Sequence, residues 1–393
     1  MRRHRWPIVL LVVLLILAAV GWVGKGLAFN RLRAGLQLDW KTEKVTALSS
    51  LPQSAGGHGY GQGTVLKHRD LQSLQITDWQ TLLNGNVTWD TATLWPASLP
   101  AGFQPDRILE LGKDPGLGIR QLHQQGINGK GVRVAFLDRP MSLGHKELGS
   151  NVSYFQVGYP ALPEMHGVAC ASLLVGRNVG VAPAANLTYY GVQWSIQSLE
   201  PMALILERIL DKNLTLPPAQ RIRAVGTSQQ ITPDKPGYDR LMKAVQRANF
   251  LGVLFLWTET PSYHFMGLDR DPTGDPNDPN SYLPGMFVRG TFYRGDFAQS
   301  TIPWVPMDSR TVAAETGPED YRYDREGGMS WSVPWVVGLY ALAAQVKPTV
   351  TPQEFWQALK ETGTYRTFTQ EGKEYKLGPI ANPPALIAKL KQG

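Results

Sequence analysis

Three side chains of the types that perform acyl transfer lie at the ends of predicted strands or the starts of predicted helices. Asp138 ends a short β-branched run, as a buried parallel strand does when it delivers an acid to its carboxyl end. His166 opens an apolar segment that Gly176 ends, and Ser330 follows the glycine pair 327–328 before another apolar run. An acid, an imidazole and a hydroxyl together can make an activated serine nucleophile.

Each of these residues alone has a simpler explanation. Ser330 or Ser332 can be only an N-cap. Asp138 can be a turn or cap residue, and His166 can be a satisfied structural group. We favour the catalytic interpretation because their order and surroundings agree. We expect Pro334 in the first turn of the serine helix, where its missing N–H costs nothing.

The stretches around these residues resemble the subtilase family of serine proteases, whose chain order is also Asp, His, Ser. The matching stretches are residues 129–138 with 145–148, His166-Gly167 and its helix, 180–183, and 328–330 with Pro334 and Gly338. The resemblance covers roughly residues 104 to 386. It implies that Asp138 orients the imidazole, His166 is the general base and then acid, and Ser330 attacks the scissile carbonyl.

Two positions depart from the family pattern. Arg139 replaces the small residue that usually follows the acid; it can pair with that carboxylate, but we expect it to point into solvent. The family places an oxyanion-hole Asn after a strand, and residues 252–260 contain none. Losing one such donor costs roughly two to three orders of magnitude in turnover. Thr258 can donate through its hydroxyl beside the Ser330 N–H, whereas Glu259 in that position would repel the oxyanion.

The predicted substrate-binding strand also differs from the family. Subtilases place Ser-Leu-Gly-Gly there, and the counterpart here is Gly226-Thr227-Ser228-Gln229-Gln230. The bulkier glutamines narrow the cleft. The expected substrate is therefore a protein or peptide from a restricted range.

A Pro/Gly-rich loop carries the candidate calcium ligands Asp269, Asp271, Asp275 and Asp278. Spaced carboxylates can wrap Ca²⁺, which needs six to eight oxygen ligands, and the family often carries structural calcium. The alternative is a solvated acidic loop. No cofactor is required for the predicted reaction.

The region around the three residues alternates between predicted helices and strands. The predicted helices are 117–125, 166–175, 199–210 and 238–250, and the predicted strands are 132–137, 187–192, 221–226 and 253–257. This order predicts an α/β fold with a doubly wound, mostly parallel sheet flanked by helices. A capping box, Thr351-Pro352-Gln353-Glu354, opens a last helix that Gly363 ends.

Composition sets outer limits on the function. A chain of 393 residues with 43% hydrophobic content can bury a large core. Four of its seven net positive charges come from Arg2, Arg3, Arg5 and Lys25. The net charge therefore does not indicate a nucleic-acid-binding surface. The single cysteine, Cys170, excludes an intramolecular disulfide and is expected to be inert core. We expect a monomer.

The N-terminus predicts export. A basic cluster precedes the apolar run Ile8 to Gly24, which favours an uncleaved signal anchor over a cleaved signal peptide, with a cytosolic core helix as the remaining alternative. The predicted organisation is a signal anchor or signal peptide at 1–29, a linker or pro-region at 30–100 and a catalytic domain at 101–393. The catalytic domain would then be extracytoplasmic, with a membrane contact through the N-terminal helix.

The predicted linker contains two local signals. Residues 49–63 are Gly/Ser-rich and read as a tether or loop, and Asn84-Gly85 predicts a hairpin turn before the strand that includes Trp89. A pro-segment and a membrane-proximal spacer both remain open.

The sequence therefore favours an extracytoplasmic subtilisin-like serine endopeptidase that works through an acyl-enzyme. The alternative is a catalytically impaired subtilase-like protein that binds peptides or regulates another protein. A weaker third hypothesis is an esterase or other acyl hydrolase built on the same three residues.

Overall fold

The computed structural model describes residues 29–31, 40, 43–54, 63–100, 102–158, 162–193, 198–258, 264–295, 297 and 301–392. The predicted membrane-targeting run, Ile8 to Gly24, lies outside the described residues, and so does the centre of the Gly/Ser-rich stretch. Among the helices that the structure does describe, none is long and apolar enough to cross a bilayer.

A six-stranded sheet in the order β1-β7-β8-β6-β9-β10 forms the centre of the molecule. Its strands are β1 Phe29–Arg31, β6 Arg133–Asp138, β7 Val152–Val157, β8 Asn186–Val192, β9 Ile222–Thr227 and β10 Leu254–Leu256. Neighbouring strands are parallel except for β1, which pairs antiparallel with β7. The predicted mostly parallel α/β sheet is confirmed.

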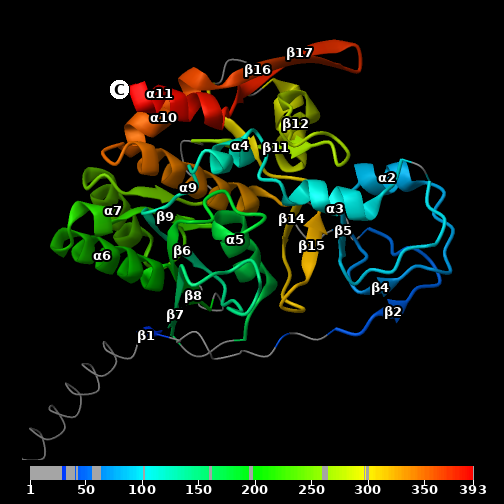
Figure 1. The fold of residues 1–393 in the computed structure, drawn as a ribbon, viewed down its shortest axis with the longest axis horizontal. Coiled ribbons are helices and arrows are strands. Elements are labelled where there is room, and N and C mark those ends of the chain that lie inside the picture. The colour runs from blue at the N-terminus through cyan, green and yellow to red at the C-terminus, as the bar shows by residue number, and fades with distance from the viewer. Residues whose placement is uncertain are drawn as a thin grey trace, which may run out of the picture.

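Helices cover both faces of this sheet (Figure 1). One layer contains α5 Met165–Val175 and α9 Met329–Val346, and the other contains α6 Glu200–Thr215 and α7 Tyr238–Phe250. The side chains of β6 alternate between the two faces of the sheet, so each face offers apolar residues to one helix layer. Val134 and Phe136 belong to the hydrophobic cluster of α5 and α9, whereas Ala135 and Leu137 belong to that of α6 and α7.

Helix α9 begins earlier than its proline suggested. Gly328 has φ +68°, a left-handed conformation that favours glycine, and the helix starts directly after it. Pro334 is therefore the sixth helical residue, and the expectation of a first-turn proline is wrong. Because Pro334 has no N–H, the Ser330 carbonyl four residues earlier lacks its intrahelical donor. That carbonyl accepts from the Ser228 hydroxyl at 2.8 Å instead.

A second sheet, in the order β12-β11-β13-β17-β16, lies toward the C-terminal end of the chain. Its strands are β11 Met266–Arg270, β12 Tyr282–Pro284, β13 Trp304–Pro306, β16 Thr364–Gln370 and β17 Lys373–Ile380. Around it lie α4 Ile119–Gln124, α8 Arg289–Arg294, α10 Pro352–Thr362 and α11 Pro383–Gln392. Helix α10 starts as predicted, with the Thr351 hydroxyl accepting from Glu354 N at 3.1 Å and Gly363 at its C-cap.

Much of the predicted linker is built into the folded body. Strands β3 Thr64–Val65 and β5 Val87–Asp90 join β14 Arg310–Ala313 and β15 Tyr321–Asp324 in one sheet, and β2 Thr46–Ala47 pairs with β4 Arg69–Asp70. Trp89 packs against Tyr323 in a tilted arrangement, with ring centroids 4.2 Å apart. Asn84-Gly85 does not form a hairpin, because it ends helix α2 Trp79–Asn84, and helix α3 Pro105–Lys113 follows further on.

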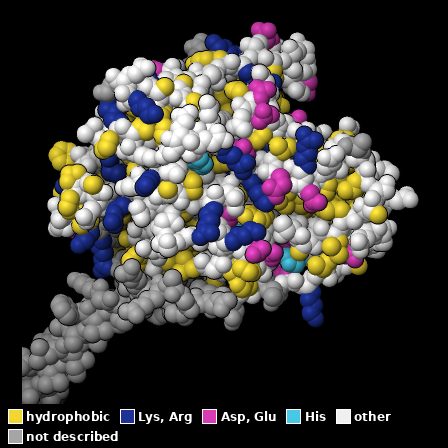
Figure 2. Space-filling model, viewed as in Figure 1, with side chains coloured by type: hydrophobic (Ala, Val, Ile, Leu, Met, Phe, Trp, Pro, Cys, Tyr) yellow, Lys and Arg dark blue, Asp and Glu magenta, His cyan; other side chains and the backbone are white. Residues whose placement is uncertain are grey.

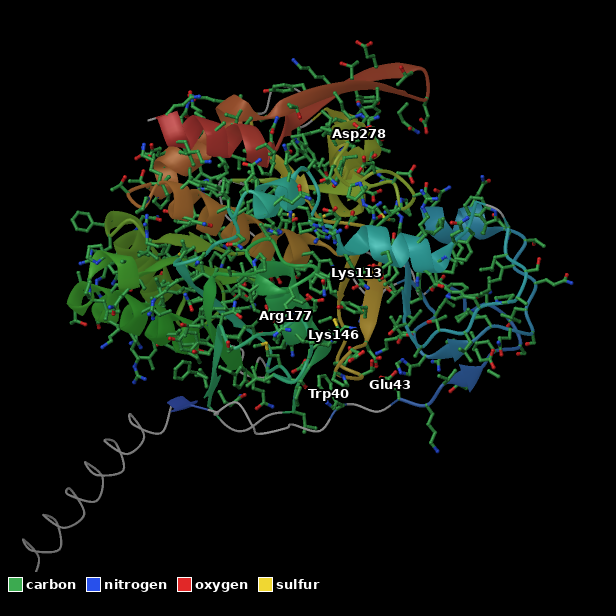
Figure 3. All side chains as sticks on the ribbon, in the orientation of Figure 1. Trp40, Glu43, Lys113, Lys146, Arg177 and Asp278 are labelled. Carbon is green, nitrogen blue, oxygen red and sulfur yellow. The ribbon has the colours of Figure 1, made fainter. Side chains whose placement is uncertain are left out.

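Charged side chains are spread over the surface. On the face shown in Figure 2, basic and acidic side chains lie close to one another. Trp40 packs edge-on against His145, and Glu43 pairs with Lys67 at 3.3 Å (Figure 3). Aromatic and ionic contacts therefore hold these two residues on the folded body.

Candidate active site

An acid and an imidazole meet at the carboxyl end of the central strand. Asp138 is the last residue of β6, and His166 is the second residue of α5. The Asp138 Oδ1 atom lies 2.5 Å from His166 Nδ1, and both side chains are buried. The backbone N–H of Arg139 donates to the same oxygen at 2.7 Å. A carboxylate in this position holds the imidazole in one orientation and leaves Nε2 for chemistry.

The close approach of α5 to the end of β6 depends on the glycine after His166. A Cβ at Gly167 would lie 2.3 Å from the Arg139 carbonyl oxygen and 2.8 Å from the Tyr189 hydroxyl. That hydroxyl donates to the Arg139 carbonyl at 2.7 Å, and burial raises its pKa well above the ordinary value. The pair His166-Gly167 therefore reflects a packing requirement as well as a chemical one.

The Arg139 side chain does not pair with Asp138. Its guanidinium pairs with Glu164, the N-cap residue of α5, at 3.1 Å, and both side chains are partly exposed. The prediction that Arg139 points away from Asp138 agrees with this contact, although its partner is a carboxylate rather than water alone. The ion pair joins the segment after β6 to the start of the histidine helix.

Ser330 is the second residue of α9 and contacts Ser228, which directly follows β9. Its hydroxyl donates to the Ser228 carbonyl oxygen at 3.5 Å, a long hydrogen bond. The amides of the first helical turn have no intrahelical acceptor, so the Ser330 N–H is available to a developing oxyanion. The reciprocal bond from the Ser228 hydroxyl to the Ser330 carbonyl fixes the serine against the end of β9.

Cys170 lies between His166 and the backbone of Ser330. Its Sγ lies 3.7 Å from His166 Nδ1, 3.8 Å from the Ser330 carbonyl oxygen and 3.5 Å from Ser228 Oγ. Ligand atoms of Asp138, His166 and Cys170 all lie within 4.8 Å of one another. Burial, reinforced by the Asp138 charge, raises the pKa of the thiol well above its usual value. Cys170 is therefore an uncharged residue of the hydrophobic core, as predicted, and it also contacts the candidate site.

Trp331 forms the wall beside the imidazole. It follows Ser330 in α9, is fully buried and packs on His166 with ring centroids 5.4 Å apart and a 37° interplanar angle. A Cβ at Gly327 would lie 1.9 Å from Trp331 Cδ1, so the first glycine of the pair makes room for the indole. The sequence contained this residue next to Ser330, but only the fold shows that it contacts the histidine.

The turn before Ser330 is held by a buried carboxylate that sequence reasoning missed. Asp308 accepts from Gly327 N at 2.9 Å through one oxygen and from Met286 N at 2.8 Å through the other. Burial, with the nearby Asp269 charge, raises the pKa of Asp308 to about 8. The sequence around the turn could not predict this contact, because Asp308 is distant in sequence from the turn that it supports.

The predicted substrate strand and the predicted oxyanion residue touch each other. Gly226 and Thr227 end β9, Ser228 follows as a buried residue, and Gln229 is half-buried. The Thr258 hydroxyl donates to the Gln229 carbonyl oxygen at 3.2 Å. Thr258 must release this bond before it can serve an oxyanion, so its role stays a prediction. Glu259 lies outside the described residues.

No protein-family model matches the sequence. A thermostable alkaline protease from Halalkalibacterium halodurans is 26% identical over 265 residues, spanning 63% of this chain and 66% of that protein. In fold, the subtilase cytotoxin SubAB structure matches 72% of this chain and 96% of its own, with TM-score 0.52 and 14% identity. The chain is a divergent relative of the subtilases.

A further solved structure extends the fold match. The PatG macrocyclase in complex with peptide has TM-score 0.50 and 15% identity, and the match covers 70% of this chain and 95% of that one. At these identities the structures establish a shared fold alone. The similarity to the alkaline protease supports the subtilase resemblance drawn from the motifs, while the roles of the individual residues stay predictions.

The acidic loop of this subtilase relative does not fit the predicted calcium site. Asp269 is buried in β11, where Arg325 and Arg289 both bind its carboxylate. Asp271, Asp275 and Asp278 are exposed, and each accepts from a backbone N–H two residues later. The guanidinium groups already neutralise the one buried carboxylate, and the other three act as local turn caps. These contacts favour the alternative interpretation, a solvated acidic loop.

Proposed function

We propose that this chain is an extracytoplasmic, subtilisin-like serine endopeptidase that works through Asp138, His166 and Ser330. The observation that carries the proposal is the buried 2.5 Å contact between His166 Nδ1 and Asp138, with the Ser330 backbone beside the same cysteine sulfur. The similarity to a protease over 265 residues supports the same reaction class. Hydrolysis of a peptide bond is the activity that this arrangement can perform.

Acylation begins when Ser330 Oγ leaves the weak bond to the Ser228 carbonyl and attacks the scissile carbonyl carbon. His166 takes the hydroxyl proton and then gives it to the leaving amine, while Asp138 stabilises the imidazolium. Water attacks the resulting ester in the second half, and His166 again removes and returns the proton. The Ser330 N–H stabilises both oxyanions, and we propose Thr258 as a second donor once it leaves the Gln229 carbonyl.

The substrate range is proposed to be restricted. An extended peptide would bind along Gly226, Thr227, Ser228 and Gln229, where the family has smaller residues. The Thr258 bond to Gln229 joins the predicted walls of the cleft and must be displaced or accommodated by the substrate. Breaking this hydrogen bond costs free energy. Only substrates whose other contacts with the cleft offset that cost would be cleaved quickly.

A second candidate function is peptide binding without useful turnover. It is favoured by the engaged Thr258 hydroxyl and by the 3.5 Å bond that directs Ser330 Oγ toward the Ser228 carbonyl. The two candidates differ in one measurable property, which is whether bound peptides are cut.

A peptide-library digest followed by mass spectrometry tests the proposed activity directly. We expect cleavage at a small set of sites by the wild-type chain and none by Ser330→Ala. Cleavage that is broad and casein-like would contradict the restricted range. Binding without cleavage would replace the proposal with the second candidate, and cleavage of esters alone would assign another acyl hydrolase.

We also propose that the N-terminal apolar run attaches the catalytic domain to the outer side of a membrane. The motivating feature is the basic cluster followed by Ile8 to Gly24. The full chain expressed in bacteria should co-sediment with membranes, resist extraction at high salt and be digested by protease added outside. A full chain found in the cytosolic fraction would contradict this localisation.

A further inference from the structure

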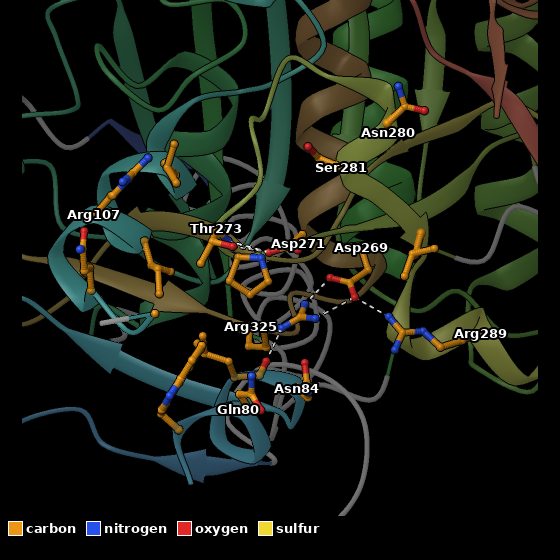
Figure 4. Close-up of a pocket in the computed structure, with 18 of the residues that line it drawn as sticks. Gln80, Asn84, Arg107, Asp269, Asp271, Thr273, Asn280, Ser281, Arg289 and Arg325 are labelled. Carbon is orange, nitrogen blue, oxygen red and sulfur yellow. Dashed lines mark hydrogen bonds and ion pairs between the residues drawn. The ribbon is translucent and has the colours of Figure 1, made fainter. Parts of the chain in front are cut away.

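A large cavity of about 850 Å³ lies between the N-terminal helices and the second sheet, and it contains no member of the proposed triad. Helices α2 and α3 form one side, and the β11–β12 segment with α8 forms the other (Figure 4). A cavity of this size can hold an organic molecule of drug-like dimensions. Nothing in the protease reaction requires it.

The cavity lining carries more positive than negative charge. Four arginines and two aspartates line it, a net of two positive charges, and they are Arg107, Arg289, Arg325, Arg366, Asp269 and Asp271. Asp269 is shared between Arg325 and Arg289 (Figure 4). One carboxylate therefore serves two guanidinium groups, which leaves unneutralised positive charge on this side of the cavity.

Two further arginines add donors that the described residues do not use. Arg107 is exposed on α3 and has neither a hydrogen bond nor an ion pair to a carboxylate within the described chain. Arg366 donates to the carbonyls of Asn280 and Tyr282, but its Nε is buried without an acceptor in the described structure. A guanidinium presents donors in a planar fork that matches carboxylate and phosphate oxygens.

A buried arginine behind the cavity strengthens this field. Arg270 is only 2% exposed, and its guanidinium donates to the carbonyls of Asp271, Pro272, Gly274 and Ser309. These neutral acceptors satisfy its hydrogen bonds without cancelling its charge. The loop that lines the cavity at Asp271 and Thr273 is thus folded around a cation in a low-dielectric position, where its potential is less screened.

The rest of the lining is suited to the body of an organic molecule. Trp79, Leu83 and Leu111 supply apolar surface, while Gln80 and Asn84 add amide donors. Figure 4 shows Gln80 and Asn84 near Arg325, with Arg107 on the other side of the cavity from Arg289. These apolar side chains lie on α2 and α3, the side of the cavity that also carries Arg107. Apolar surface and arginines in one lining fit a ligand with an anionic group on a planar or aliphatic body.

We propose that this cavity binds a small organic anion, a phosphate or carboxylate attached to an apolar body. Arg107, Arg366 and the Arg289–Asp269–Arg325 cluster hold the oxygens, and Trp79 with its apolar neighbours contacts the body. Binding at this cavity is independent of the proposed hydrolytic activity. Its failure would leave the protease proposal unchanged.

Isothermal titration of the folded chain with phenyl phosphate tests the proposal, with phenylacetate and inorganic phosphate as the comparison ligands. We expect saturable binding of phenyl phosphate at one site per chain, weaker binding of inorganic phosphate, and no heat from sodium chloride at matched ionic strength. If phenylacetate binds more tightly than phenyl phosphate, the anionic group that the cavity prefers is a carboxylate and not a phosphate.

Arg107→Gln should weaken phenyl phosphate binding about tenfold, and Arg107→Glu should abolish it, because this exposed residue can be changed without removing a buried contact. The matched control is Arg177→Gln, an exposed arginine outside the cavity lining that is labelled in Figure 3, and it should bind as the wild type does. Absence of saturable binding to any of the three anions would overturn the proposal. Equal affinity in the wild type and Arg107→Glu would also overturn it.

Discussion

The two halves of the candidate site are organised differently. In the proton-transfer half, Asp138 and His166 bind each other directly at 2.5 Å in a buried position. In the acyl-binding half, the hydroxyls of Ser228, Ser330 and Thr258 each donate to a backbone carbonyl of the same half. In the proposed reaction, the first half is assembled before a substrate arrives. The second half has bonds that a substrate must replace.

This difference indicates where selectivity arises. A preassembled acid–imidazole pair gives no discrimination between peptides, because every substrate uses it in the same way. Bonds that must be exchanged in the acyl-binding half make turnover depend on how well each substrate compensates for them. The account therefore predicts large, substrate-independent losses from changes in the first half and smaller, substrate-dependent losses from changes in the second.

Asp138→Asn tests the proton-transfer half. We expect kcat to fall on the order of 10⁴-fold for every substrate, because the amide no longer favours the imidazole tautomer that accepts the serine proton. Steady-state kinetics on at least two peptides measures this effect. A loss that differs strongly between peptides would show that Asp138 acts through substrate binding instead.

Thr258→Val tests the acyl-binding half. Removal of the hydroxyl should lower kcat about 10²-fold, the scale for one oxyanion donor, with little change in KM. Thr258→Ser is the matched control and should retain most of the activity. A loss below threefold in Thr258→Val would restrict the residue to its structural bond with Gln229.

Asp308→Asn tests whether the serine turn responds to pH. The folded state keeps a proton on Asp308 up to about pH 8, whereas the unfolded chain releases it near the ordinary value of 3.8, so this group lowers stability as pH rises between those values. Relative to the variant, the wild type should therefore lose about 1 kcal/mol or more of unfolding free energy between pH 5 and pH 8. Urea unfolding at both pH values measures it.

The control for this test is Asp106→Asn, a change at an exposed acid in the first turn of α3. Its unfolding free energy should differ from that of the wild type by a nearly constant amount over the same pH range. A constant difference for Asp308→Asn as well would contradict the raised pKa of that carboxylate.

Arg139→Gln should have the smallest effect. The ion pair with Glu164 is partly exposed on both sides, and such pairs contribute about 0–1 kcal/mol to stability. We expect kcat to change less than threefold and the melting temperature to fall by a few degrees at most. A kcat loss of 100-fold would show that Arg139 acts on Asp138, and the proton-transfer half would no longer be self-contained.

The local parts of this site could be predicted from sequence. A β-branched run ending in Asp138 and an apolar helix after His166 carry their periodicity within a few residues, and the structure has β6 and α5 there. Pro334 was misplaced because the left-handed Gly328, rather than the proline, sets the start of α9. Asn84-Gly85 was misread because both a helix end and a hairpin use the same residue types.

The contacts made over long sequence distances could not be predicted in this way. Cys170 resembled an ordinary core residue because its position beside Ser228 depends on how α5 and β9 pack. Asp308 bonds to Gly327 across two strands, and Trp89 joins Tyr323 in a sheet that the linker interpretation did not include. Periodicity reports which face of an element is buried, but it does not identify the partner.

Labelling with an active-site serine phosphonate, read by intact mass and peptide mapping, tests the central claim most directly. The account predicts one adduct per folded chain, located on Ser330, with no adduct in Ser330→Ala. It also predicts normal labelling in Ser332→Ala, whose hydroxyl donates to the Pro306 carbonyl at 3.2 Å away from the triad. A folded wild-type chain that takes up no label, or label that persists in Ser330→Ala, would contradict an activated nucleophile at this position.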